Sequence, residues 1–587
     1  MPARDSMILR VDLTAGSFEH RTLEQCAVDR WIGGRGLAGA FLYPRCTLSW
    51  DSPDMPLILM AGPLAGTSAP TSGRMCIMSR SPLTGTVGDC SVGGALAFQL
   101  RRAGLLGIVF TGRSRSACGL EIEDGSVRLE DASGLAGRDT RELRGLLSGR
   151  GSVAVTGPAA ENGVLYASVM VDDCHAAGRN GIGLAFAAKN LKYVCIRGSG
   201  KVPVRDPARL SGACEQIRRL MAASPVIMGE FGLRSMGTGA LYDLMHARGM
   251  MPTANFRRTR FEPAPGMNAP ALKRLYSTRR TGCAGCGILC RKVGAGGVHI
   301  PEFETMSHFS ALLENDDTAC VVKANDICNR LGMDTISAGS TLACHAEIIG
   351  RRLPAAEILA LLEDIGRGRG GGLELGSRRY AAGMGRPWAS ISVKGLELPA
   401  YDPRGAYGMA LAYATSTRGG CHLRAYPISH EILRRPVATD RLSFSGKARI
   451  IKIAEDANAA IDSISACKFS FFGATLEEYA EAVSAVGGIE VSAQDLISAG
   501  ERIYFRERLM NQANGFGAGD DDLPARFFRE AGTSTAWMET PPLPREGFVE
   551  ALRRYYVIRG IDECGLALPS KRIELGIDAQ AEAADRL

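Results

Sequence analysis

Three cysteines in the stretch "RRTGCAGCGILCRKVG" (279–294) carry the strongest chemical signal in the sequence. Cys283, Cys286 and Cys290 form a C-x2-C-x3-C run. Thiols this close together can join a disulfide, bind zinc or hold an iron–sulfur cluster. Zinc prefers four ligands in a tetrahedron, often from two separated pairs, whereas a cubane cluster takes four cysteines, commonly several from one loop. The spacing therefore favours a cluster, leaves zinc open, and requires a fourth ligand from elsewhere.

Two later segments share a layout of polar residues, namely "ICNRLGMDTIS" (327–337) and "AAIDSISACKFSFF" (459–472). Asn329 stands five positions before Asp334, and Asp462 stands five positions before Cys467. Small residues occupy the turn between the members of each pair. The repeated layout predicts two similar loops that bind similar halves of a ligand. Cys467 is also the candidate for the fourth thiolate, with a buried structural cysteine as the alternative.

Candidates for acid–base chemistry follow the cysteine run and recur later in the chain. The stretch "HIPEFETMSHF" (299–309) contains Glu302 and Glu304, and we expect a loop there. The stretch "YATSTRGGCHLRAY" (413–426) contains His422 after two glycines. A single histidine is more often structural than catalytic, although its pKa suits proton transfer near neutral pH.

Four glycine-rich stretches with Arg, Ser, Thr or Asn occur before residue 205. Bare backbone amides and guanidinium groups suit a ligand with phosphates and polar ring atoms. Any one such stretch is more simply a tight turn in a β-protein, but four in one region favour ligand binding. The stretches are "GGRGLAG" (33–39), "GTSAPTSGRMCIMSRSPLTG" (66–85), "GDCSVGG" (88–94) and "AAGRNGIGLAFAAKNLKYV" (176–194).

The hydrophobic pattern predicts an α+β multidomain fold with a β-rich first part. Residues 1–205 contain short apolar strands, including a hairpin over 119–131 that turns at Asp124-Gly125. Helical spacing takes over afterwards, in 206–224, 317–332, 355–368 and 445–467. We predict a β-rich domain over 1–205 and two mostly helical domains over 206–395 and 396–587.

The bulk properties limit the classes of partner. The 587 residues include 69 Lys and Arg against 62 Asp and Glu, a net charge of +7. This charge is small and dispersed, so we do not expect nucleic-acid binding. The first residues lack the apolar core of a signal peptide, and no apolar run is long enough to span a bilayer. We therefore expect a cytoplasmic protein with no membrane span.

Taken together, these motifs resemble the aldehyde:ferredoxin oxidoreductase family of tungsten, sometimes molybdenum, enzymes. The resemblance runs nearly from end to end, and its specificity lies in the order and spacing of the motifs. They are "IGGRGLA", "PTSGRMCIMSRSPLTG", "GRNGIGLAFAAKNLKYV", the cysteine run, "LGMDTIS", "VKGLELPAYDPRG", "YATSTRGGCH", "AIDSISACKF", "GERIYFRERLMNQANGFGAGDDDLPARFF" and "LRRYYVIRGIDECG".

The resemblance implies a cofactor set and a role for each motif. The β-rich domain would be the base for two metal-binding pterins, and each helical domain would grip one pterin. A [4Fe–4S] cluster would lie beside one pterin, and we also consider Mg2+ as a bridge between the pterin phosphates. The implied cofactor-binding residues are Arg74, Ser91, Gly93, Arg179, Gly181, Asn329, Asp334 and Asp462, and the implied cluster ligands are Cys283, Cys286, Cys290 and Cys467.

Three positions depart from the usual family pattern. Asn329 stands where the family usually has Asp, Ser465 where it has Gly, and Ser91 where it has Asn. Asn329 can still form hydrogen bonds, but it carries no charge, so the electrostatics around the pterin would differ.

The implied reaction converts an aldehyde and water to a carboxylic acid and passes electrons to ferredoxin or to an iron–sulfur electron-transfer subunit. Glu304 would act as a general base, and His422 would form a hydrogen bond to the aldehyde oxygen. The alternatives on the same scaffold are a class II aryl-CoA reductase catalytic subunit and a hydroxy-acid oxidoreductase. The alternative of another class is a non-catalytic iron–sulfur electron-transfer subunit. The expected assembly is a homodimer or a hetero-oligomer.

Overall fold

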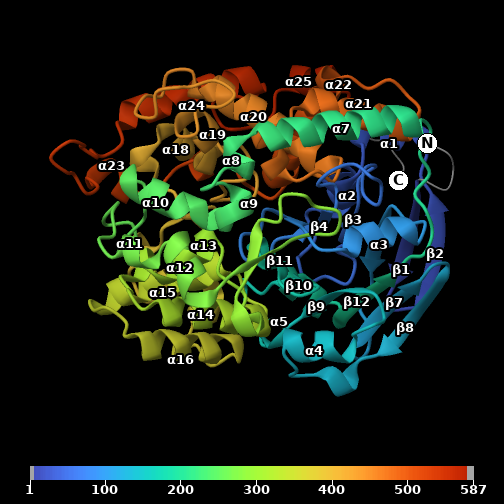
Figure 1. The fold of residues 1–587 in the computed structure, drawn as a ribbon, viewed down its shortest axis with the longest axis horizontal. Helices are drawn as coiled ribbons and strands as arrows, with labels where there is room; N and C mark the ends of the chain where they lie inside the picture. The colour runs from blue at the N-terminus through green and yellow to red at the C-terminus, as the bar shows by residue number, and fades with distance from the viewer. Residues whose placement is uncertain (1–5, 578–587) are drawn as a thin grey trace.

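Two six-stranded mixed sheets form the first third of the chain in the computed structural model, which describes residues 6–577 (Figure 1). The first sheet has the strand order β2-β1-β6-β3-β4-β5, and the second has the order β11-β10-β9-β12-β7-β8. The strands are β1 (Met7–Asp12), β2 (Ser17–Thr22), β3 (Leu57–Met60), β4 (Met75–Arg80), β5 (Val87–Val92), β6 (Gly107–Thr111), β7 (Cys118–Glu123), β8 (Ser126–Asp131), β9 (Ser152–Thr156), β10 (Val169–Val171), β11 (His175–Ala177) and β12 (Leu191–Arg197).

The central strand β3 shows how the two faces of the first sheet are used. Successive side chains of a strand point to opposite faces. Leu57 and Leu59 belong to an apolar core shared with strands of the second sheet, so this core joins the two sheets. Ile58 and Met60 belong to a second core on the other face, shared with helices of the later chain. Both faces of β3 are therefore buried, which accounts for its wholly apolar sequence.

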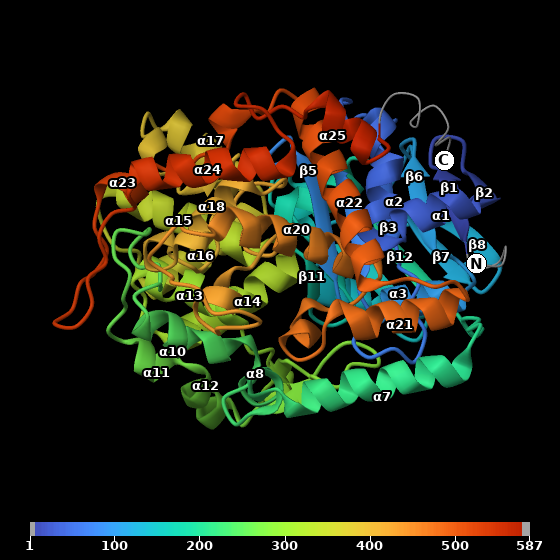
Figure 2. The ribbon, with the colours of Figure 1, turned by 90° about the horizontal axis from the view of Figure 1, so that it is seen from above.

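Helices cover the outer face of the first sheet and form most of the rest of the molecule (Figure 2). α2 (Gly34–Leu42) contacts β3 and β4 and also packs on α20 (Lys447–Ser463) and α22 (Ala493–Ala513). α24 (Arg545–Arg559) packs on α20, and α7 (Pro207–Ala223) packs on α21 (Leu476–Gly487). A separate group contains α14 (Thr318–Leu331), α15 (Thr335–Ile349) and α16 (Ala355–Gly366).

Two connections between helices share a local shape. After α14, Gly332 adopts left-handed backbone with φ of 76°, and Asp334 then caps α15 through its side chain. After α20, Ser465 adopts left-handed backbone with φ of 67°, and Cys467 then precedes the short helix η10 (Lys468–Phe472). Left-handed backbone favours glycine, so Ser465 is the less usual choice, and its hydroxyl accepts a hydrogen bond of 2.6 Å from the Gly62 N–H.

Each sheet holds one of these connections through a glycine that follows a strand. A Cβ on Gly62, after β3, would lie 2.3 Å from the Ser463 carbonyl oxygen. A Cβ on Gly157, after β9, would lie 2.3 Å from the Leu331 carbonyl oxygen. Contacts this close exclude any side chain at the two glycines. The backbone of each sheet therefore packs directly against the backbone of one helical loop.

The predicted fold class is confirmed, because a β-rich part precedes a mostly helical part. The hairpin at Asp124-Gly125 is confirmed by the pairing of β7 with β8, and the four predicted helical segments correspond to α7, α14, α16 and α20. The loop expected around Glu302 and Glu304 is wrong, because α13 (Phe303–Phe309) begins between them. The domain boundaries near 205 and 395 stay predictions. Within residues 6–577, no helix is long and apolar enough to cross a membrane.

Candidate active site

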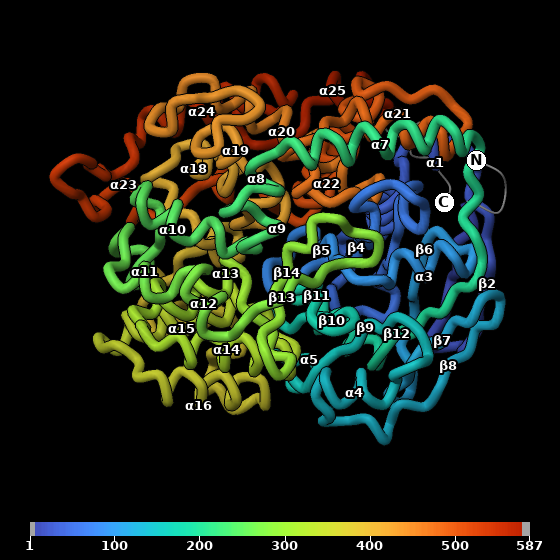
Figure 3. The backbone as a smooth tube through the Cα atoms, in the orientation of Figure 1, coloured from blue at the N-terminus to red at the C-terminus, as the bar shows by residue number. Residues whose placement is uncertain are grey.

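A cavity of about 990 Å3 lies where the sheets, the cysteine-bearing hairpin and the helical loops meet. The hairpin consists of β13 (Arg279–Thr281) and β14 (Arg291–Val293), and it lies beside β10 and β11 (Figure 3). The cavity wall brings together most of the residues predicted to carry chemistry. They are Arg74, Ser91, Gly93, Arg179, Cys283, Cys286, Cys290, Glu304, Asp334, His422, Asp462 and Cys467.

The four predicted cluster cysteines line this one cavity. Burial raises the pKa of Cys286 to about 11 and also raises the pKa values of Cys290 and Cys467. Buried thiols of this kind ionise readily only beside a positive partner. Within residues 6–577, no three His, Cys, Asp or Glu side chains converge closely enough to hold a single metal ion.

The backbone of the β-rich part fixes the position of the cysteines. A Cβ on Gly93 would lie 2.4 Å from the Cys283 sulfur, so only glycine fits at that position. The Gly94 carbonyl accepts a hydrogen bond of 3.2 Å from the Ala284 N–H in the cysteine run. On the opposite wall, the Cys467 N–H donates a hydrogen bond of 3.0 Å to the Thr71 carbonyl. The two cysteine segments are therefore tied to the same base.

Arg74 supplies positive charge next to these thiols. Its Nε donates a hydrogen bond of 2.8 Å to the Ser91 hydroxyl, which holds the guanidinium at the cavity wall. Burial alone would lower the pKa of Arg74, but the neighbouring Cys467 and Cys283 thiolates raise it above its ordinary value. Arg74 therefore favours the ionised form of Cys467, which is the form that binds metal.

Each predicted binding loop places a carboxylate beside a cation. The Asp334 carboxylate lies 3.1 Å from Arg179 Nε. The Asp462 carboxylate forms an ion pair with Lys468 and lies 3.6 Å from Arg35. Burial would raise the pKa of Asp462, but Lys468 and Arg35 lower it below its ordinary value. The two loops therefore match in their electrostatics as well as in their backbone.

Glu304 and His422 face each other across the cavity wall. Glu304 Oε2 accepts a hydrogen bond of 2.8 Å from the Ala400 N–H, and Glu304 Oε1 lies 3.5 Å from His422 Nε2. Burial raises the pKa of Glu304 to about 8 and lowers that of His422 well below its ordinary value, so both groups are neutral at pH 7. Glu304 Oε1 and His422 Nδ1 are buried and lack a hydrogen-bond partner among the described residues. Buried polar atoms usually have a hydrogen-bond partner, and these two belong to side chains that line the cavity, where a ligand would supply one.

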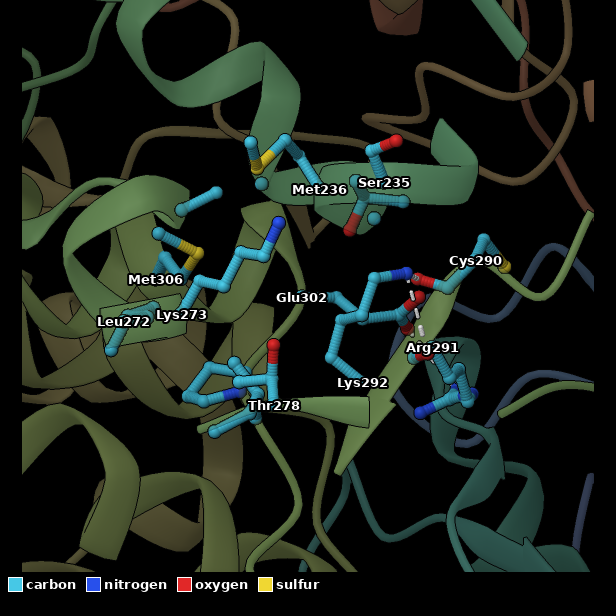
Figure 4. A pocket seen from close by; sticks show the side chains of 16 residues that line it. Ser235, Met236, Leu272, Lys273, Thr278, Cys290, Arg291, Lys292, Glu302 and Met306 are labelled. Carbon is cyan, nitrogen blue, oxygen red and sulfur yellow. Dashed lines mark hydrogen bonds and ion pairs between the residues drawn. The ribbon is translucent and has the colours of Figure 1, made fainter. Parts of the chain in front are cut away.

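Glu302 lies in a different environment. Its carboxylate lies 3.1 Å from the Arg291 guanidinium, so its charge is balanced within the protein. Figure 4 shows Glu302, Arg291, Lys292 and Cys290 around a small recess beside the cysteine run. Because α13 begins between the two glutamates, they do not share one orientation. Glu302 has a structural partner, and Glu304 has none of opposite charge.

Two residues predicted to bind the cofactor lie off the wall of the main cavity. Gly181 adopts left-handed backbone with φ of 72° before α6 (Ile182–Ala187), where a Cβ would lie 2.1 Å from the Leu165 carbonyl oxygen. Asn329 lines a neighbouring recess of about 70 Å3, which shares Asp334 with the main cavity. The left-handed backbone and the close Leu165 carbonyl therefore explain why residue 181 is glycine.

Several wall residues were not predicted individually. The rings of Tyr401 and Tyr426 lie 5.3 Å and 6.0 Å from the His422 ring. Asp89 and Arg424 form a buried ion pair in the cavity wall, with Arg424 Nη1 3.1 Å from Asp89 Oδ2. Asp89 lies in the glycine-rich stretch 88–94, and Arg424 and Tyr426 lie in the segment 413–426, so the segments were identified. A local pattern, however, does not reveal pairing between distant segments.

Comparison with protein families gives two matches that together span most of the chain. Residues 8–198 match the N-terminal domain of aldehyde ferredoxin oxidoreductase, and residues 212–577 match domains 2 and 3 of the same enzyme. The tungsten-containing aldehyde ferredoxin oxidoreductase of Pyrococcus furiosus is 35% identical, with 97% of this chain and 98% of that protein covered. The enzyme of the same description from Thermococcus kodakarensis is 36% identical over the same shares.

More distant proteins share the full length as well. The WOR-like subunit of an aliphatic sulfonate oxidoreductase from Pyrococcus furiosus is 24% identical, with 98% of this chain and 97% of that protein covered. Among solved structures, the active-site complex of benzoyl coenzyme A reductase with 1,5-dienoyl-CoA has a TM-score of 0.84 at 22% identity. That alignment covers 99% of this chain and 98% of the solved chain, which shows a common fold.

Proposed function

The chain belongs to the aldehyde ferredoxin oxidoreductase family, and on that premise we propose that it oxidises an aldehyde and water to a carboxylic acid. Electrons would leave through a [4Fe–4S] cluster to ferredoxin or to an iron–sulfur subunit. The observation that best supports this chemistry is the pair of buried, unpartnered atoms Glu304 Oε1 and His422 Nδ1 on the cavity wall. A proton acceptor and a hydrogen-bonding group side by side suit the addition of water to a carbonyl.

The residues present fit a tungsten bis-pterin and a cluster. Two loops of matching shape, each with a carboxylate beside a cation, suit two similar pterins. Arg179 with Asp334 would hold one pterin, and Lys468 with Asp462 would hold the other. Cys283, Cys286, Cys290 and Cys467 would hold the cluster, since four thiols and a neighbouring Arg74 suit its ligation. Mg2+ as a bridge between the pterin phosphates stays a prediction.

The proposed reaction balances as aldehyde plus water giving carboxylic acid, two protons and two electrons. When bound, the tungsten bis-pterin supplies the two-electron oxidant and the cluster supplies the path for single electrons. Glu304 Oε1 takes a proton from the attacking water, because it is the carboxylate oxygen without a protein partner. His422 orients the substrate by a hydrogen bond to the aldehyde oxygen. The buried position of both side chains limits competition from bulk water.

The pH dependence of aldehyde oxidation tests this assignment. A general base must be ionised, and burial raises the pKa of Glu304 to about 8. Below that pH the carboxylic acid predominates and cannot accept a proton. We therefore expect kcat to increase with pH and to level off above an apparent pKa near 8, measured anaerobically with a viologen dye as acceptor.

The Glu304→Gln variant is the control for this profile, because the amide cannot titrate. Its residual rate should be independent of pH between 6 and 9, a range chosen to bracket the value near 8. A wild-type rate that falls as pH rises through 8 would mean that the protonated Glu304 is the active form, which contradicts the role of base. Absence of turnover with every aldehyde tested would contradict the proposed reaction itself.

A further inference from the structure

The outer part of the cavity wall carries exposed arginines that lack an acidic partner, unlike the paired charges of the interior. It is formed by the segment 429–436, which begins in α19 (Ile428–Glu431), by one side of α20 and by η10. Arg434 and Arg435 are exposed there, and Ile453 of α20 is 51% exposed, which identifies this part as the mouth. We propose that this mouth selects an aromatic aldehyde that carries an anionic group at the end remote from the aldehyde. This substrate class rests on the proposed aldehyde oxidation.

A chain of aromatic rings leads from the catalytic pair toward the mouth. The His422 ring lies 5.3 Å from Tyr401, Tyr401 lies 5.8 Å from Tyr426, and Tyr426 lies 6.1 Å from Phe472. The Phe472 ring is stacked on Phe469 at 6.2 Å. All of these rings line the cavity. Aromatic walls favour a flat aromatic substrate through offset and edge contacts.

The charges on the wall single out the two arginines at the mouth. Deeper in the cavity, Arg424 pairs with Asp89, Arg179 with Asp334, and Arg291 with Glu302. Lys468 pairs with Asp462, and Arg74 lies beside the cysteine thiols. The guanidinium groups of Arg434 and Arg435 have neither an ion pair nor a hydrogen bond to any residue among 6–577. Their charge therefore remains available to a ligand.

No carboxylate of the described wall opposes these arginines at the mouth. The five acidic residues of the wall are Asp89, Glu302, Glu304, Asp334 and Asp462. Glu304 lies beside His422 deep in the cavity, and the other four pair with the cations named above. Two adjacent guanidinium groups bind a carboxylate well, because their N–H donors match its two oxygens. The proposed substrate would place its aldehyde at Glu304 and His422, its ring along the tyrosines and its carboxylate at the mouth.

The test compares three aldehydes on the holoenzyme, namely 4-carboxybenzaldehyde, benzaldehyde and a 4-trimethylammonio-benzaldehyde. We expect kcat/KM to decrease in that order at low salt. In Arg434→Gln/Arg435→Gln, the ratio of kcat/KM for the carboxylated over the neutral aldehyde should fall by about fivefold or more. In Arg434→Glu/Arg435→Glu, the cationic aldehyde should become preferred over the carboxylated one. The wild-type preference should also weaken as salt is raised, since exposed charges are screened.

A binding measurement separates this inference from the proposed reaction. Terephthalate, the product of the carboxylated aldehyde, should bind to the wild-type holoenzyme more tightly than benzoate in calorimetry, and the glutamine variant should lose that difference. Arg386→Gln is the matched control, because Arg386 is exposed and lies off the cavity wall. Equal binding of terephthalate and benzoate, or a preference that survives in the glutamine variant, would overturn the inference. If no aldehyde is oxidised but terephthalate binds as expected, the proposed reaction fails while the anion-selective mouth stands.

Discussion

Glu304→Gln should lower aldehyde turnover by at least ~100-fold, the usual minimum for the loss of a general base. The substitution keeps the size of the side chain, and its amide oxygen can still accept the hydrogen bond from the Ala400 N–H. What it loses is the ability of the second oxygen to take a proton. Tungsten and iron content should therefore stay at the wild-type level while kcat falls. His422→Ala should show a loss of similar size, because it removes the group that orients the aldehyde oxygen.

Glu302→Gln is the control for this result, since the two glutamates are two positions apart in the sequence. Glu302 already pairs with Arg291, so its charge is balanced within the protein. We expect its turnover to stay within a few-fold of the wild type. An inactive Glu302→Gln with an active Glu304→Gln would mean that the other carboxylate is the base. Full activity of both variants would place the proton chemistry elsewhere, and an aryl-CoA thioester would then be the next substrate to test.

Cys467→Ser should remove most of the bound iron and weaken the visible absorption of the cluster. A serine oxygen is a poorer ligand for iron than a thiolate, and Cys467 comes from a different segment than the other three thiols. Its backbone is held by a hydrogen bond of 3.0 Å from the Cys467 N–H to the Thr71 carbonyl. Iron determination and the absorption spectrum of anaerobically purified protein provide the measurement.

Cys214→Ser provides the matched control for the iron measurement. Cys214 is buried in α7, its thiol donates a hydrogen bond to the Ser68 carbonyl at 3.4 Å, and it lies off the cavity wall. The iron content of this variant should equal that of the wild type. If Cys467→Ser also retains about four iron per chain, the stoichiometry of a cubane cluster, then the fourth ligand is not Cys467.

Local sequence patterns were sufficient for much of the fold. The Asp124-Gly125 turn and the helices α7, α14, α16 and α20 follow from turn chemistry and from helical periodicity, both of which act over neighbouring residues. The matched layouts at 329–334 and 462–467 correctly indicated two similar loops. The left-handed residue at Ser465 could not be inferred, because the hydrogen bond that supports it comes from Gly62 in the first sheet.

The sequence allowed site residues to be predicted only where their types and spacing form a recognisable motif. The cysteine run did so, and glycine-rich stretches marked the β-rich wall. The contact between Glu304 and His422 could not be inferred, since it depends on how two helical regions pack. The choice between Glu302 and Glu304 also required the structure, because the beginning of α13 between them decides which one meets a cation. Arg434 and Arg435 belong to no motif. Their proposed role in substrate selection follows only from their position at the mouth of the cavity.

The tungsten and iron content of protein purified without oxygen tests the central claim most directly. A bis-pterin enzyme with one cluster should contain about one tungsten and about four iron per chain, in line with a cubane cluster held by four cysteines. Elemental analysis by mass spectrometry measures both metals in the same sample. Iron at that level with neither tungsten nor molybdenum would contradict the account and indicate a non-catalytic electron-transfer subunit.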